Sequence, residues 1–348
     1  MAPDRERGNW HESAILLPVS TRLVRRLSIH NAKVKTMAYQ SVGLNVTSHC
    51  NHRCVFCFQG HADRPSHKPY PLLLEQLAQA AEQAPGCSLV LSGGEATLHP
   101  DITRLIRAAA NHGFCYITLF TNGSGFHDRS VVRELKESGL EHAMVSLHGL
   151  RPDTHNLLVG RESWHAAVEG VATALQQGIL ITVNTVATSV NLQELAPLHA
   201  FLDERFPALT AHRLSYLACI GQMRWRDDLL APYQDVAGIV RRLAAEPRRI
   251  PLQCDLVPLC LLAEDFRVGV ETNARRGEYL IIDKRPNDCW RGVSGRPCLV
   301  CTWRHHCNGL QVAPVLRYGV PPGYGSCCDT PEAMAVSKCD NSDRTGRL

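Results

Sequence analysis

Three cysteines near residue 50 have a spacing that suits metal chemistry. Cys50, Cys54 and Cys57 form a C-x3-C-x2-C run. Three thiolates on so short a loop can hold three irons of a cubane cluster and leave the fourth iron without a protein ligand. Such an open position is where a substrate or cofactor binds. The alternative is a zinc loop completed by one histidine, for which the candidates are His49, His52 and His61.

A second dense group of cysteines lies further along the chain. Cys298, Cys301 and Cys307 follow a C-x2-C-x5-C pattern, and a zinc knuckle completed by His305 or His306 is the alternative to an iron–sulfur cluster. The chain has 15 cysteines, and its first residues do not indicate an export signal. We therefore expect metal or redox chemistry rather than disulfides. The isolated cysteines are expected to be small buried hydrophobes: Cys87, Cys115 and Cys219.

Composition narrows the remaining classes of protein. A length of 348 residues accommodates one large α/β domain with an appendage. The net charge of +4 is too mild to indicate a nucleic-acid partner, and no apolar run is long enough to cross a membrane. These features lead us to expect a cytoplasmic protein with neither a membrane nor a nucleic-acid partner.

The chain alternates short apolar runs with amphipathic stretches, which predicts repeated strand–helix units. The expected strands are Val42–Val46, Ser88–Leu91, Tyr116–Phe120, Ala143–Leu147, Leu180–Val186 and Arg213–Leu217. The expected helices are Leu72–Gln83, Asp101–Asn111, Ser130–Ser138, Ser163–Gln177 and Leu192–Asp203. This order predicts a parallel sheet with right-handed crossovers. Six strands are too few for a closed eight-stranded barrel, so we expect an α/β fold of the partial (β/α)6 TIM-like type. Past residue 220 the alternation fades.

Polar or glycine-bearing segments follow four of these strands directly. They are Thr47–Cys57, Ser92–Glu95, Thr121–Gly123 and His148–Gly149. Because chemistry in such folds lies at the carboxyl ends of the strands, we expect these segments to meet on one rim of the barrel.

The first cysteine run resembles the signature of the radical S-adenosylmethionine (SAM) superfamily. Phe56 precedes the last cysteine, and Ser92-Gly93-Gly94-Glu95 resembles that family's glycine–glycine–glutamate motif. The resemblance implies that Gly93 and Gly94 let backbone approach the methionine end of SAM and that Glu95 receives its ammonium group. Without the cysteines, this tetrad would equally suit a turn that begins a helix.

The resemblance also implies further cofactor-binding residues. Phe56 belongs to this set, and Ser146 and Asn184 match strand positions that contact SAM. Arg161 is a candidate partner for its carboxylate. The alternative for Ser146 and Asn184 is ordinary hydrogen bonding to backbone.

By the same resemblance, the open iron of a [4Fe–4S] cluster chelates SAM. Reductive cleavage then yields methionine and a 5′-deoxyadenosyl radical, which takes a hydrogen atom from substrate. A reductase with flavodoxin, or a ferredoxin, would supply the electron.

The second cysteine group resembles the SPASM or twitch extensions of radical SAM enzymes. This implies an auxiliary [4Fe–4S] cluster on Cys260, Cys298, Cys301 and Cys307. The pattern departs from a full SPASM domain because Gln311 stands where another cysteine usually follows, which puts a second auxiliary cluster in doubt. The cysteines left without a role are Cys254, Cys289, Cys327, Cys328 and Cys339.

The expected organisation is a lead-in over 1–38, a partial barrel over 39–220, an auxiliary-cluster region over 221–330 and a tail over 331–348. Enzymes extended in this way often modify ribosomally made peptides or build natural products. The lead-in is too short for a typical leader-binding domain, which favours a small substrate or a peptide presented by a partner. The alternatives are a maturase of a protein or cofactor, and a zinc-binding structural or adaptor protein.

Overall fold

The computed structural model describes residues 41–219, 221–222 and 226–262, the backbone of 270–272 and 279–281, and residues 314, 317, 318 and 321. Its centre is a parallel sheet in the order β8-β7-β6-β5-β4-β3-β2-β1-β9. The strands are β1 (Ser41–Thr47), β2 (Ser88–Gly93), β3 (Tyr116–Thr121), β4 (His142–Ser146), β5 (Leu180–Ala187), β6 (Ala211–Tyr216), β7 (Leu252–Asp255), β8 (Val270–Thr272) and β9 (Tyr279–Ile281). Among the described residues β8 and β9 do not pair with each other, so the sheet is open.

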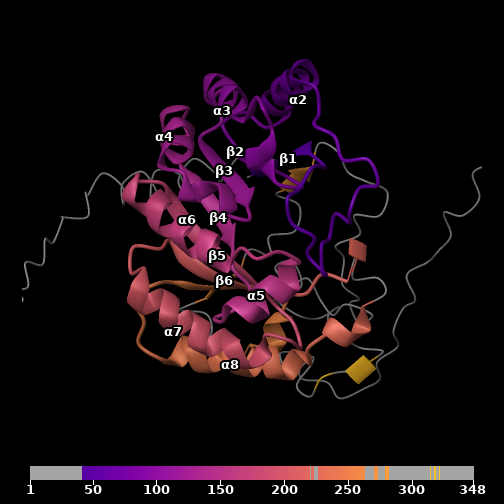
Figure 1. Ribbon diagram of the computed structural model, residues 1–348, viewed down its shortest axis with the longest axis vertical. Helices are drawn as coiled ribbons and strands as arrows, with labels where there is room; N and C mark the ends of the chain where they lie inside the picture. The colour runs from indigo at the N-terminus through magenta and orange to yellow at the C-terminus, as the bar shows by residue number, and fades with distance from the viewer. Residues whose placement is uncertain are drawn as a thin grey trace, which may run out of the picture. The chain divides into compact units, whose positions relative to one another are not determined.

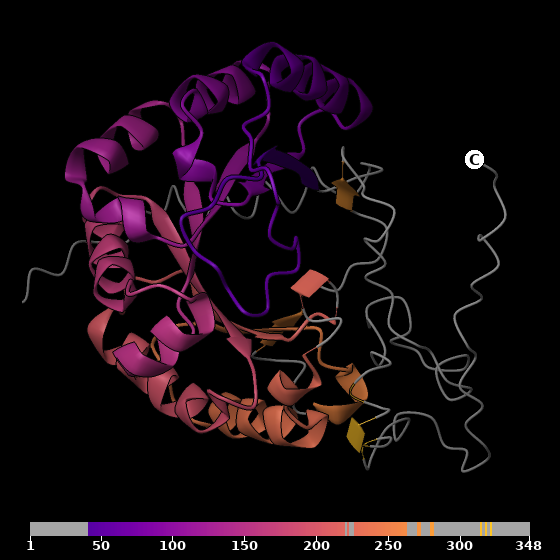
Figure 2. The same ribbon diagram turned by 45° about the vertical axis from the view of Figure 1, so that its right-hand side comes forward.

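Helices alternate with the first seven strands. They are α2 (Tyr70–Gln83), α3 (Ile102–Asn111), α4 (Arg129–Glu137), α5 (Pro152–Val159), α6 (Trp164–Gln176), α7 (Leu195–Arg205) and α8 (Tyr233–Ala245). Figure 1 shows this succession around the sheet. In Figure 2 the helices form an arc outside the strands, and the loop after β1 crosses the inner side of that arc. No described helix combines the length and apolar character needed to cross a membrane.

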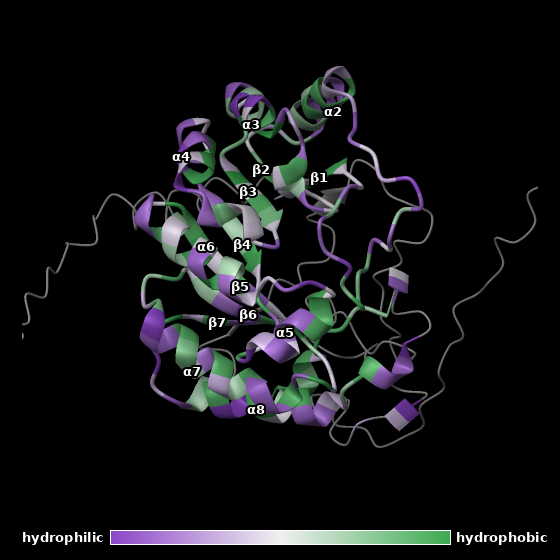
Figure 3. Cartoon of the chain, in the orientation of Figure 1, coloured by the Kyte–Doolittle hydropathy of each residue, from purple (hydrophilic) through white to green (hydrophobic). Residues whose placement is uncertain are grey.

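Burial explains why these segments fold as they do. Val42, Leu44 and Val46 of β1 are fully buried, as are Leu77 of α2 and Leu105 of α3, and all five belong to one core cluster. Strands covered on both faces need continuous apolar runs, whereas the helices need only one apolar face. Figure 3 shows this difference, with apolar residues concentrated along the strands and mixed polarity on the helices.

The open parallel α/β architecture confirms the expectation, but the count of six strands is too low. The sheet continues beyond residue 220 through α8 and β7, and β9 pairs with β1 at the opposite edge. The apolar spacing of Val236, Ile239, Val240 and Leu243, all buried in α8, is a helical signal that was available in the sequence. Short α5 was also missed. The expected cysteine-rich extension falls largely outside the described residues.

Two helix glycines give a matched test of packing. Gly170 of α6 faces the backbone of Gly123, and a Cβ added to it would lie 2.4 Å from the Gly123 carbonyl oxygen. Gly238 of α8 has open space around it, with no heavy atom within 4 Å of an added Cβ.

We predict opposite effects of alanine at these two positions. Gly170→Ala should destabilise the fold by about 1–3 kcal/mol because it forces α6 away from the turn after β3. Gly238→Ala should stabilise it by about 0.5–1 kcal/mol through helix propensity alone. Urea denaturation of both variants measures the free energy of unfolding, and equal effects in the two helices would contradict this packing.

Candidate cofactor and metal site

Residues 48–60, the cysteine loop, are held by backbone hydrogen bonds against the turn that follows β2. The Gly94 amide donates to the Thr47 carbonyl oxygen at 2.7 Å, and the Glu95 amide donates to that of His49 at 2.8 Å. A Cβ on Gly93, whose φ is +144°, would lie 2.3 Å from the Thr47 oxygen, and one on Gly94 would lie 2.3 Å from the His49 oxygen. The glycine pair therefore permits a close approach of the chain to its own backbone, whereas the approach to a cofactor expected from the sequence stays a prediction.

The Glu95 side chain is 1% exposed and binds protein donors. Its Oε1 accepts hydrogen bonds from the Thr97 amide at 3.1 Å, the Thr97 hydroxyl at 2.6 Å and the Thr121 hydroxyl at 2.7 Å. Its Oε2 accepts one from the Asn122 amide at 2.6 Å. Burial raises the pKa of Glu95, and these donors act in the opposite direction. The carboxylate thus ties the β2 turn to the loop after β3.

Side chains and a helix end hold the cysteine loop from other directions. Asn122 Nδ2 donates to Asn51 Oδ1 at 2.7 Å. The last carbonyls of α5 accept hydrogen bonds from the loop, with Arg53 N 3.0 Å from Val159 O and Val55 N 3.0 Å from Leu158 O. The loop is therefore fixed by backbone contacts that α5, unrecognised from the sequence, supplies.

The three thiols of the loop lie close enough to influence one another. Cys50, Cys54 and Cys57 are half-buried and form no disulfide. Burial raises the pKa of Cys50 to about 11 and that of Cys54 to about 12, and the neighbouring thiols add to both shifts. A metal would have to displace these protons on binding. In the described part of the chain no three His, Cys, Asp or Glu side chains converge on a single ion position, whereas cluster thiolates each bind a different iron.

His52, between the first two cysteines, is the unexpected member of the loop. Its ring is 4% exposed, and neither ring nitrogen has a hydrogen-bond partner. Burial, with a smaller effect of the Arg161 charge, lowers the pKa of His52 to about 4. Its backbone amide donates to Cys50 Sγ at 3.4 Å. The sequence placed His52 only among alternative zinc ligands.

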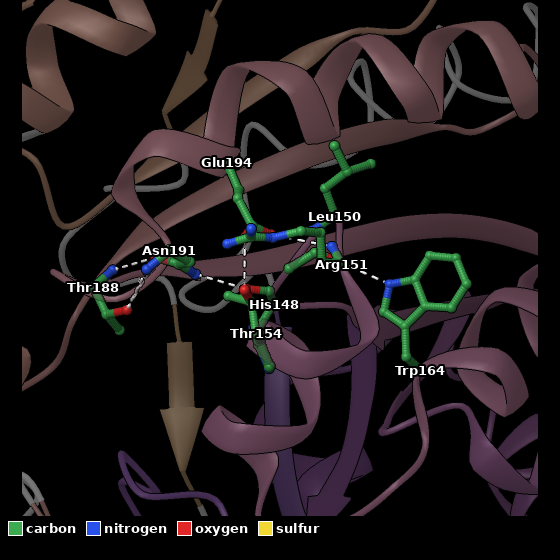
Figure 4. A network of polar contacts seen from close by, with 9 residues as sticks. His148, Leu150, Arg151, Thr154, Trp164, Thr188, Asn191 and Glu194 are labelled. Atoms are coloured by element: carbon green, nitrogen blue, oxygen red, sulfur yellow. Dashed lines mark hydrogen bonds and ion pairs between the residues drawn. The ribbon is translucent and has the colours of Figure 1, made fainter.

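Phe56 packs edge-on against His148, with ring centroids 4.8 Å apart. His148 lies on the loop after β4, and Figure 4 shows how that loop is held. Asn191 Nδ2 donates to the His148 carbonyl at 2.7 Å, and the Trp164 indole donates to the Gly149 carbonyl at 3.0 Å. This packing gives Phe56 a structural contact in addition to the cofactor role expected from the sequence.

Glu194 anchors the same loop from the start of α7 (Figure 4). Its carboxylate accepts hydrogen bonds from the Leu150 amide at 2.8 Å and the Thr154 hydroxyl at 2.6 Å, and pairs with the Arg151 guanidinium at 2.7 Å. Burial acts to raise the pKa of Glu194, but these donors outweigh it and hold the pKa below its usual range. Sequence reasoning missed both Asn191 and Glu194, although Asn three residues before Glu at a helix start is a capping signal.

The structure brings two of the remaining expected residues together. Ser146, the last residue of β4, is the register partner of Asn184 within β5, and the Ser215 hydroxyl donates to Asn184 Oδ1 at 2.7 Å. Arg161 lies elsewhere, exposed just beyond α5 and within electrostatic reach of His52. It therefore belongs with the cysteine loop rather than with the strand ends.

The described cysteines outside the loop differ in exposure. Cys254 is buried in β7 and Cys260 is half-buried beside α8. Cys87 is buried as expected, Cys219 is half-buried, and Cys115 is exposed, so the expectation of a buried Cys115 was wrong. The other cysteines of interest lie outside the described residues: Cys289, Cys298, Cys301, Cys307, Cys327, Cys328 and Cys339.

Part of the chain, including the cysteine loop, matches a known family. Residues 44–202 match the radical SAM superfamily model. A probable GTP 3′,8-cyclase of Saccharolobus solfataricus is 28% identical over 159 residues, 44% of this chain and 50% of the relative. One from Methanothermobacter marburgensis is 27% identical over 167 residues, 47% of this chain and 54% of the relative. The chain thus spans about half the length of these relatives.

Solved structures show the same fold. Streptococcus suis SuiB bound to S-adenosylmethionine has a TM-score of 0.57 at 16% identity, covering 89% of this chain and 82% of SuiB. SuiB bound to its precursor peptide SuiA has a TM-score of 0.58 at 16% identity, covering 94% and 85%. The family match over residues 44–202 and the shared fold both point to a radical SAM domain in this part of the chain, and radical SAM proteins are enzymes. The superfamily implies a SAM-binding [4Fe–4S] cluster and SAM.

We predict that Glu95→Gln destabilises the fold by about 1–3 kcal/mol, measured by urea denaturation. Glutamine offers one oxygen, so in either orientation its NH2 group faces a backbone N–H, of Thr97 or of Asn122, and leaves that donor unpaired. Glu75→Gln on the exposed face of α2 is the matched control and should change stability by less than about 0.5 kcal/mol. A neutral Glu95→Gln would mean that the carboxylate does not brace the loops.

Proposed function

We propose that the enzyme cleaves SAM reductively at a [4Fe–4S] cluster held by Cys50, Cys54 and Cys57. The observation that carries this proposal is the grouping of three cysteine thiols, close enough to shift one another's pKa, on a loop at the carboxyl ends of the strands. This donor set fits a cluster with one iron left open. When bound, the cluster supplies the electron that splits SAM into methionine and a 5′-deoxyadenosyl radical, which removes a hydrogen atom from substrate.

The chain's own residues orient the cofactor in this proposal. The hydroxyl of Ser146 and the amide of Asn184, from paired positions of β4 and β5, would bind polar groups of SAM. Arg161, beside the cysteine loop, would pair with a carboxylate. Phe56 supplies an apolar face. Gly93, Gly94 and Glu95 act by holding the loop, and Glu95 Oε2, with one donor bound, keeps capacity for the SAM ammonium.

A peptide is the substrate class that we favour, in natural-product or ribosomal-peptide modification. The support is the similarity over 94% of the chain to SuiB, which was solved with a precursor peptide. A nucleotide is the second candidate, because the sequence relatives are probable GTP 3′,8-cyclases over about half their length. The other candidate activities are modification of a small molecule and maturation of a protein or cofactor. A flavodoxin with its reductase, or a ferredoxin, would deliver the electron.

We further propose that the region 221–330 carries an auxiliary [4Fe–4S] cluster on Cys260, Cys298, Cys301 and Cys307. The support is their sequence pattern and the half-buried position of Cys260 beside α8. A cluster with four thiolates has no open iron and suits electron transfer.

We predict that Cys54→Ala abolishes formation of 5′-deoxyadenosine from SAM and dithionite. Anaerobically reconstituted protein is assayed by chromatography, with GTP and candidate peptides added in parallel to identify the substrate class. Cys87→Ala, which alters a buried cysteine of the core cluster, is the control and should keep SAM cleavage. Deoxyadenosine production by Cys54→Ala would overturn the proposed function.

We predict that iron counting separates the two clusters. The wild type should bind about 8 irons per chain, and Cys301→Ala about 4. Because the first cluster is intact in this variant, SAM cleavage should persist while product formation stops. An unchanged iron content in Cys301→Ala would contradict the auxiliary cluster without affecting the first.

A further inference from the structure

The imidazole of His52 is an unusual feature for a protein interior. Within the described residues, the buried side-chain nitrogen and oxygen atoms without a hydrogen-bond partner belong to three histidines, His52, His61 and His199, and only in His52 are both nitrogens unpaired. A neutral imidazole always carries one N–H donor. Leaving such a donor buried and unpaired costs about 1–3 kcal/mol, so a partner for it is expected when the site is complete.

Two histidine rings close to His52 have no acceptor nitrogen left for it. His148 and His155 are the histidines within electrostatic reach. His148 Nδ1 already accepts from the Val186 amide at 3.2 Å, and His155 Nδ1 accepts from the His148 amide at 3.1 Å. The unprotonated nitrogens of both rings are therefore occupied.

The backbone carbonyls at the end of α5 bind amides of the cysteine loop, and none of them accepts a hydrogen bond from the His52 ring. The last carbonyls of α5, of Leu158 and Val159, accept from the amides of Val55 and Arg53 in the cysteine loop. The groups around His52 that gain acceptor capacity when iron binds are the sulfurs of Cys50 and Cys54, on either side of it in the chain. The His52 amide already donates to Cys50 Sγ at 3.4 Å, so this residue lies against a candidate ligand.

We propose that the His52 imidazole donates an N–H···S hydrogen bond to a thiolate or sulfide sulfur of the cluster bound by the cysteine loop. This inference rests on the proposed function, since it requires that cluster. Hydrogen bonds to sulfur stabilise the more negative, reduced state and raise the reduction potential. His52 is then a positioning residue that tunes the centre and does not react itself.

The test compares His52→Leu with His52→Gln in reconstituted full-length protein without SAM. Leucine fills the site but removes the donor, whereas glutamine retains an N–H. We expect His52→Leu to lower the equilibrium constant for reduction of the first cluster about tenfold, which is about 59 mV for a one-electron couple. His52→Gln should recover at least half of that shift. Redox titration followed by electron paramagnetic resonance measures both.

A spectroscopic measurement tests the contact itself. In the reduced wild type, electron–nuclear double resonance in D2O and H2O should reveal two exchangeable protons coupled to the cluster, from the backbone amide and from the imidazole of residue 52. His52→Leu should lose the second coupling and keep that of the amide. His142→Leu is the control: that ring is buried and bonded to Thr118 and Thr182, so its loss should leave potential and coupling unchanged.

The possible results are distinct. An unchanged potential and proton coupling in His52→Leu overturn the hydrogen bond while leaving the cluster in place. A nitrogen coupling of the size expected for direct ligation also overturns it, because His52 would then bind iron. Failure of the wild type to assemble any cluster on the loop would instead refute the proposed function.

Discussion

The site depends on the contact between the cysteine loop and the turn at the end of β2. Two backbone hydrogen bonds, Gly94 N to Thr47 O and Glu95 N to His49 O, join segments that are about 45 residues apart in sequence. They form only because Gly93 and Gly94 carry no Cβ, since each would otherwise overlap a carbonyl oxygen. The position of the thiols is thus set by packing of main chain on main chain, which deforms less readily than contacts between long side chains.

Two buried glutamates extend this arrangement around the rim by the same chemistry. The Glu95 carboxylate links the turn after β2 to the loop after β3, and the Glu194 carboxylate links the loops after β4 and β5. A carboxylate is suited to both positions because its two oxygens accept several hydrogen bonds at once. The difference between them is charge compensation. Arg151 pairs with Glu194 and helps to lower its pKa, whereas Glu95 has only neutral donors and burial raises its pKa.

The sequence predicted the regular part of the fold because periodicity and turns are local. Six strands and five helices were found, and the glycine–glycine–glutamate turn was located at the end of β2. The partners of that turn could not be predicted, because spacing along the chain does not say which distant carbonyl a glycine will meet. Helix α5 has weak periodicity, with Leu157 63% exposed beside buried Leu158 and Val159, and so escaped recognition. Cys115 lies in an apolar segment but is exposed where the sheet begins.

The backbone hydrogen bonds of the cysteine loop also explain how its three thiols can be positioned before any metal binds. Its backbone is fixed by bonds to the β2 turn and to the end of α5, none of which involves a thiol. The conformational entropy of the loop is therefore lost when the protein folds and not when a metal binds. Metal binding then needs only to displace protons from Cys50 and Cys54. Within the described cysteine loop, His52 is the exception to this independence, because both of its buried ring nitrogens are unpaired in the protein alone. A ligand that supplies an acceptor for this unpaired donor stabilises the folded site further. A sulfur atom of a cluster held by Cys50 and Cys54, which flank His52 in the chain, is such an acceptor.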